Sequence, residues 1–186
     1  MVVAGNFRKG IVVILTMLLP SGAAALERIA PAGSGNGAIF ETLERFHGHA
    51  CAGSLIGARL GLAAKTALKA AGGEGKLKAK YFANNCSIDG VQIAAGTTAG
   101  NKAIEVVDAN ENRLLLSAEK NGRQVEAHLS RVAEEKAKKF RELRGKGNAL
   151  PVGSPERLQV ERAVEDILCW FRNAPDVAVV QVRVVK

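Results

Sequence analysis

Apolar residues recur at two different spacings along this chain. A spacing of three to four residues is typical of amphipathic helices, whereas alternation of apolar and polar residues, or a β-branched run, is typical of strands. The pattern predicts helices at residues 38–46, 54–71, 86–95, 131–144 and 155–171, and strands at residues 76–83, 103–107, 113–118, 124–129 and 177–185.

Capping and turn residues support these boundaries. Asn121-Gly122 is a strong hairpin signal between two of the strands, and Ser130 and Ser154 stand where N-caps of the last two helices are expected. The strands cluster in the middle of the chain with helices around them. We therefore expect one α+β domain over residues 38–186, with an antiparallel sheet of about four to five strands flanked by helices.

A stripe of small residues marks one face of the second predicted helix. Gly53, Gly57 and Gly61 recur every four residues, which lets a neighbouring element approach closely. Arg59 and Lys65 on the same helix argue against a contact between helices in lipid. We expect close packing within the domain, and the same face leaves a homodimer open.

The first residues have the pattern of a targeting segment. A short positive stretch precedes the apolar run at residues 11–19, and a small-x-small cleavage pattern ends at Ala25. The sequence predicts a cleaved signal peptide at residues 1–25 and a flexible leader at residues 26–37, with an uncleaved anchor as the alternative. The apolar run is short for a membrane span, so we expect a periplasmic or secreted protein without a stable span after cleavage.

Composition and charge narrow the class of partner. The chain has 186 residues, 47% of them hydrophobic, which suits one domain with a real core. Its formal charge of +8 falls by two on cleavage, because Arg8 and Lys9 are lost and no acid is. The remaining basic residues are interleaved with acids, and aromatic residues make up only 4% of the chain. We therefore predict a solvated basic surface and no nucleic-acid partner.

Candidate chemistry lies in a glycine-punctuated turn. The chain has only 3 His and 3 Cys, and His47, His49 and Cys51 stand at i, i+2 and i+4. A turn can bend two or three of these side chains toward one point. Imidazole and thiolate groups suit Zn²⁺ and other transition metals.

Cys86 adds a second thiol to this set. Cys51 and Cys86 both stand at predicted helix starts, where the peptide dipoles lower the pKa of a thiol, and Asp89 fits a first-turn acid. Two thiols and two imidazoles can close a four-ligand site or leave one position open. A structural disulfide is the alternative for the two thiols. We expect Cys169 to be buried on an apolar helix face and His128 to lie at the surface.

Two segments resemble the FmdE family, which is named for a component of formylmethanofuran dehydrogenase. They are FHGHACAG at residues 46–53 and CSIDGVQIAAGTTAGN at residues 86–101, set against F-H-G-H-x-C-P-G and C-x-x-D-x-x-Q-x-x-x-G-C-T-x-G-K-G-N. The resemblance covers roughly residues 38–130 and implies an α+β core with a metal-binding cleft, usually assigned zinc. The residues that match the family's motif positions are His47, His49, Cys51 and Cys86, with Asp89 and Gln92 as polar neighbours.

The chain departs from the family pattern at several positions. Ala52 replaces proline, Thr97 stands where the family has a second cysteine, and Asn101-Lys102 breaks the K-G-N ending. The C-terminal region offers only Cys169, so a zinc finger found in some members is not expected here. The predicted export conflicts with a role in formylmethanofuran oxidation, which is cytosolic.

Three interpretations follow from the residues and the resemblance. The first is an exported FmdE-like protein that binds Zn²⁺ or another transition metal through the four motif residues, with Asp89 or Gln92 supporting them. The second is an enzyme acting on a small molecule, with Cys51 and Asp89 as candidate catalytic residues and an open metal position in a cleft lined by Thr97 and Asn101. The third is a periplasmic module that binds a metal or a metabolite.

Overall fold

The computed structural model describes residues 37–186, and the predicted signal peptide and residues 26–36 of the predicted leader lie outside these residues. The elements are α1 (Gly37–His47), α2 (Ala52–Ala70), β1 (Leu77–Tyr81), α3 (Ser87–Ala95), β2 (Ile104–Val106), β3 (Arg113–Ala118), β4 (Gln124–Leu129), α4 (Arg131–Asn148), α5 (Pro155–Asn173), α6 (Asp176–Val179) and β5 (Val180–Val184). Among the described residues, no helix has both the length and the apolar character needed to cross a membrane.

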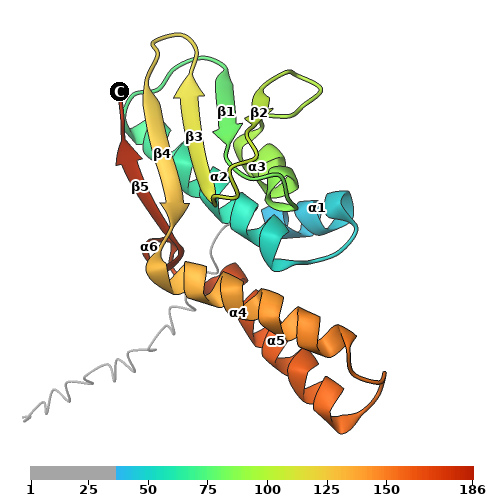
Figure 1. The fold of residues 1–186 in the computed structure, drawn as a ribbon. Coiled ribbons are helices and arrows are strands. Elements are labelled where there is room, and N and C mark those ends of the chain that lie inside the picture. Colours follow the sequence, from blue (N-terminus) through green and yellow to red (C-terminus); the bar gives the residue numbers. More distant parts are fainter. Residues whose placement is uncertain (1–36) are drawn as a thin grey trace, which may run out of the picture. The chain divides into compact units, whose positions relative to one another are not determined.

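The strands form a five-stranded sheet in the order β2-β1-β3-β4-β5 (Figure 1). The predicted α+β class and the number of strands are confirmed, and all neighbours are antiparallel except β1 and β2. This parallel pair follows from the connection between them, because helix α3 returns the chain to the same end of the sheet before β2 begins. The sheet is therefore mixed rather than purely antiparallel.

Helix α2 covers one face of the sheet (Figure 1). The burial of β3 alternates along the strand, and Leu114 and Leu116 are completely buried on the face that meets α2. On β4, Val125 and Ala127 complete the same apolar layer. A two-residue period along each strand and a helix laid across it thus account for the core.

Helices α2 and α3 pack at unusually short range, as the glycine stripe predicts. A Cβ atom on Gly57 would lie 1.9 Å from the carbonyl oxygen of Ser87, and one on Gly90 would lie 2.1 Å from that of Ser54. At the start of α2, a Cβ atom on Gly53 would lie 3.0 Å from Cβ of Cys86. The glycines therefore set two helices side by side with their N-termini together.

Helices α4 and α5 form a hairpin that extends away from the sheet (Figure 1). Helix α4 continues to Asn148, past the predicted end at residue 144, because Gly147 is buried where the two helices meet. A Cβ atom there would lie 3.3 Å from Val160. Cys169 is exposed, which corrects the predicted burial: the helix buries the neighbouring Leu168 instead, and successive helical residues point about 100° apart.

A short helix replaces the start of the last predicted strand. Residues 176–179 form α6, and β5 begins only at Val180. The side chain of Arg59, which is 1% exposed, explains this local turn. It donates hydrogen bonds to the carbonyl oxygens of Phe171, Arg172 and Ala174 and forms an ion pair with Asp176 at 2.9 Å. Contacts with α2 thus hold the chain after α5, which no local pattern predicts.

Candidate metal centre

The predicted turn between α1 and α2 brings three metal-binding side chains together. Helix α1 ends at His47, and Gly48 takes a positive φ of 84°, a conformation that glycine adopts without steric cost. The chain then turns through His49 to Cys51, which is the N-cap of α2. Donor atoms of His47, His49 and Cys51 all lie within 4.8 Å of one another. This group could hold a metal ion.

Cys51 is held by the start of its own helix. Its Sγ atom accepts a hydrogen bond from the backbone N–H of Ser54 at 3.3 Å and lies 3.5 Å from Nε2 of His47. Burial alone would raise the pKa of the Cys51 thiol, but the hydrogen bonds from Ser54 and His47 outweigh burial and lower it. The low pKa predicted for a thiol at a helix N-terminus therefore holds for Cys51.

Cys86 behaves differently. It is the N-cap residue of α3, but its side chain makes no capping hydrogen bond. Burial and the neighbouring sulfur of Cys51 raise the pKa of the Cys86 thiol, which corrects the lowered value that its position predicts. Cys86 stands outside the group of three donors, although it lines the same cavity as Cys51. All three cysteines of the chain are free thiols.

Asp89 and Gln92 connect the donor group to α3. Nδ1 of His47 donates a hydrogen bond to Oδ2 of Asp89 at 2.7 Å, which leaves Nε2 as the imidazole atom facing Cys51. The Gln92 amide donates to the other oxygen of Asp89 at 3.4 Å and accepts the backbone N–H of Ala99 at 2.8 Å. Burial lowers the pKa of His47, but its hydrogen bonds to Asp89 and Cys51 raise it overall. The predicted polar neighbours thus hold His47 in place.

The geometry of this group fits a tetrahedral transition-metal ion. A nitrogen and a sulfur bound to one zinc ion at ordinary bond lengths are about 3.5 Å apart. The distance between His47 Nε2 and Cys51 Sγ is 3.5 Å. A histidine that donates its second nitrogen to a carboxylate is the usual partner arrangement of a metal-bound imidazole. The donor set of imidazoles and thiolate is borderline to soft, as zinc prefers.

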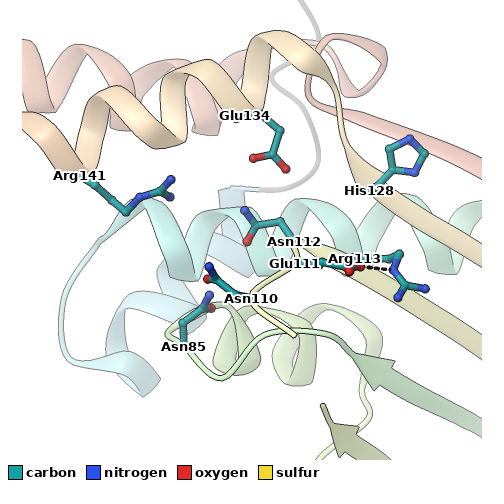
Figure 2. A pocket seen from close by; sticks show the side chains of 8 residues that line it. All are labelled: Asn85, Asn110, Glu111, Asn112, Arg113, His128, Glu134 and Arg141. Atoms are coloured by element: carbon teal, nitrogen blue, oxygen red, sulfur yellow. Dashed lines mark hydrogen bonds and ion pairs between the residues drawn. The ribbon is translucent and has the colours of Figure 1, made fainter. Parts of the chain in front are cut away.

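Two adjoining cavities lie beside the donor group. The smaller one measures about 230 Å³, and Asn85, Asn112 and Arg141 line it together with His49, Cys51, Ala52, Gly53, Ile56, Cys86, Ser87, Ala137 and Phe140. The same Asn85, Asn112 and Arg141 also line a larger polar cavity of about 580 Å³ (Figure 2). Sequence reasoning missed these three residues, because they carry no motif and come from separate segments.

The two residues expected to line the cleft, Thr97 and Asn101, lie elsewhere. Thr97 is fully buried, and its hydroxyl has no hydrogen-bond partner within residues 37–186. Asn101 lines a different cavity, beside β1 and the end of α3. His128 is partly exposed on β4, where it contacts Gln181, in agreement with its predicted surface position.

An α+β domain with a histidine and cysteine group at the paired starts of two helices defines a class of candidate metal-binding protein. The family described as "FmdE, Molybdenum formylmethanofuran dehydrogenase operon" matches residues 46–181. The chain therefore belongs to the FmdE family, as the two motifs predict.

Two individual proteins are similar to this chain. An FmdE-like protein of the tungsten formylmethanofuran dehydrogenase type, from Syntrophus aciditrophicus, has a crystal structure that matches with a TM-score of 0.52 and 26% identity, covering 80% of this chain and 71% of the other. A "Probable S-adenosyl-L-methionine-binding protein" from Archaeoglobus fulgidus is 34% identical over 93 residues, which are 47% of this chain. The match spans only 25% of that relative's length.

Proposed function

We propose that this protein is an exported FmdE-like protein that binds one Zn²⁺ ion through His47, His49 and Cys51, with Cys86 as the fourth ligand. The observation that carries the proposal is the convergence of three donors within 4.8 Å, one of them oriented by Asp89. Cys86 is the nearest further donor, because it lines the same cavity on the adjoining helix start. Family membership and the match of all four residues to the family's motif positions support the same ligand set.

Metal analysis under reducing conditions tests this proposal. The full chain, produced with export to the periplasm, is expected to hold stoichiometric zinc. The Cys51→Ser/Cys86→Ser double variant is expected to lose it. The exposed Cys169 is outside the site, so Cys169→Ser is the matched control and is expected to retain zinc. Absence of stoichiometric metal in the wild type, or its retention in the double variant, contradicts the proposal. Counting free thiols on unreduced protein identifies a Cys51–Cys86 disulfide.

A metal-dependent enzyme is the second candidate function. The observation that favours it is a group of only three close donors beside two cavities, because catalytic zinc sites keep three protein ligands and one open position. In that case the ion acts as a Lewis acid on a small molecule, with Cys51 and Asp89 as the candidate catalytic residues.

Cobalt substitution separates the two functions. If Cys86 is a ligand, Cys86→Ser reduces the thiolate-to-cobalt charge-transfer absorbance of the Co²⁺-loaded protein. If that absorbance is the same in the variant and the wild type, the fourth position belongs to solvent and the enzyme is favoured. Metal that exchanges readily with a chelator supports a periplasmic delivery module instead, whereas metal that survives extended chelation excludes delivery.

Export is a separate part of the proposal, which rests on the pattern of residues 1–25. Signal-peptide cleavage after Ala25 gives a mature chain that begins at Leu26. N-terminal sequencing of the protein from its native host, after separation of periplasm, membrane and cytosol, is the direct test. An intact N-terminus in the membrane fraction identifies an uncleaved anchor, and an intact N-terminus in the cytosol contradicts export.

A further inference from the structure

The larger cavity is polar on all sides and holds none of the proposed metal ligands. We call it the polar cleft. Its lining side chains are Asn85, Asn110, Glu111, Asn112, Arg113, His128, Glu134 and Arg141. Figure 2 shows the three asparagines across the cleft from Glu134 and Arg141, which both project from α4. A volume of about 580 Å³ is within the range of small-molecule sites.

Part of this lining is already engaged by the protein. Arg113 donates to Glu111 at 2.7 Å and to Glu126 at 3.1 Å, and its guanidinium carbon lies 3.5 Å from the centre of the Phe82 ring. His128 is paired with Gln181. These groups form the wall of the cleft, and their charges and hydrogen bonds are satisfied within it.

Three hydrogen-bond donors remain available at one end of the cleft. The side-chain oxygen of Asn85 accepts the backbone N–H of Ser87 at 2.9 Å, and that of Asn112 accepts the Tyr81 hydroxyl at 3.2 Å. Each asparagine therefore keeps its NH₂ group for a ligand. Arg141 has no side-chain hydrogen bond or ion pair to any of residues 37–186 within the ordinary distance limits.

These three residues are the ones that line both cavities. The boundary between the cavities thus presents a guanidinium and two amide donors, and a carboxylate suits a guanidinium because its two oxygens match the paired N–H groups. On the far side of this boundary, the smaller cavity has an apolar lining that includes Ile56 and Phe140. A carboxylate at the boundary could therefore place a hydrocarbon chain in the smaller cavity.

Glu134 determines which carboxylates fit. It lies on the same helix as Arg141, seven residues earlier and therefore on the same face. Like Arg141, it has no side-chain ion pair within the described chain. A second negative charge in the polar cleft would face this carboxylate at close quarters, which disfavours dianions.

We propose that the polar cleft binds a small organic monocarboxylate. Its carboxylate is held by Arg141, Asn85 and Asn112, and its apolar chain extends into the smaller cavity beside His49 and Cys51. This site does not depend on the metal, because none of its polar contacts is a proposed metal ligand.

Butyrate and succinate are matched probes, since both have four carbons and only succinate carries a second carboxylate. Titration of the ¹⁵N-labelled full chain, as purified and again after chelation, is followed through the side-chain NH₂ signals at constant ionic strength. Butyrate is expected to shift the Asn85 and Asn112 signals saturably. Arg141→Gln is expected to weaken its binding about tenfold, the loss of one charged hydrogen-bond pair. Lys138→Gln removes the same charge from an exposed position of α4 outside the cleft and is expected to bind as the wild type does.

Each result of this titration decides the proposal. Weaker binding of succinate than of butyrate, relieved by Glu134→Gln, supports it. No saturable shift at tens of millimolar butyrate overturns it, as does equal affinity in Arg141→Gln and the wild type. Binding that vanishes on chelation but survives Arg141→Gln also overturns it, because the carboxylate then binds the metal rather than the cleft. Equal binding of succinate and butyrate overturns the assigned monoanion class.

Discussion

Replacement of Gly57 by alanine tests the packing that places the candidate site. Gly57 lies on the face of α2 that contacts α3, and the added methyl group would lie 1.9 Å from the carbonyl oxygen of Ser87. Carbon and oxygen atoms in contact are ordinarily about 3.3 Å apart or more. The two helices must therefore separate by about 1.4 Å at this point, because a backbone carbonyl cannot rotate away as a side chain does.

The separation costs stability and disturbs the site. Overpacking of this kind costs about 3 kcal/mol at the upper end of the usual range. Alanine regains about 1 kcal/mol through its higher helix propensity. The expected net loss is therefore about 2 kcal/mol of unfolding free energy. Since α3 carries Cys86 and Asp89, the same displacement is expected to weaken zinc binding.

Urea denaturation of Gly57→Ala, followed by circular dichroism, measures the first effect, and competition with a chromophoric chelator measures the second. Gly145→Ala is the control. Gly145 lies within α4 with nothing within 4 Å of an added Cβ atom, so alanine there is expected to stabilise by about 0.5–1 kcal/mol. A Gly57→Ala variant that is as stable as the wild type, or stabilised like the control, refutes the packing argument.

Three further predictions concern single side chains. Asp89→Asn is expected to weaken zinc binding about 10–100-fold, because it removes the carboxylate that orients His47; chelator competition measures this, and an unchanged affinity contradicts it. Arg59→Met is expected to cost about 2 kcal/mol or more in urea denaturation, since three carbonyl oxygens lose a charged donor; wild-type stability would show that these bonds contribute nothing. The third concerns Glu126, whose pKa the hydrogen bond from Arg113 lowers, with Arg183 adding to it, against the opposing effect of burial. Its folded-state pKa lies below the unfolded value, so its stabilisation is present above the ordinary glutamate pKa and is lost as pH falls through the folded pKa. Unfolding free energy should therefore fall more steeply with acid in the wild type than in Glu126→Gln, and parallel pH profiles would exclude this contribution.

Local features of the chain were predictable where neighbours in sequence decide the structure. The bounds of β3 and β4 match the predicted strands, because their alternation and the Asn121-Gly122 turn are both local. The cluster of His47, His49 and Cys51 was predictable for the same reason: three donors within five residues need only one glycine turn to meet.

The sequence by itself determined the α+β class, the family, and the donors in the turn between α1 and α2. Tertiary structure decided the rest, because each remaining contact joins segments that are remote along the chain. The packing of α2 against α3 sets Asp89 on His47, and the buried Arg59 shapes the chain after α5. The polar cleft combines residues from three separate segments, so no periodicity or motif could predict it. Side chains meet across such distances only when helices and strands pack, and packing depends on shapes that spacing along one chain does not encode.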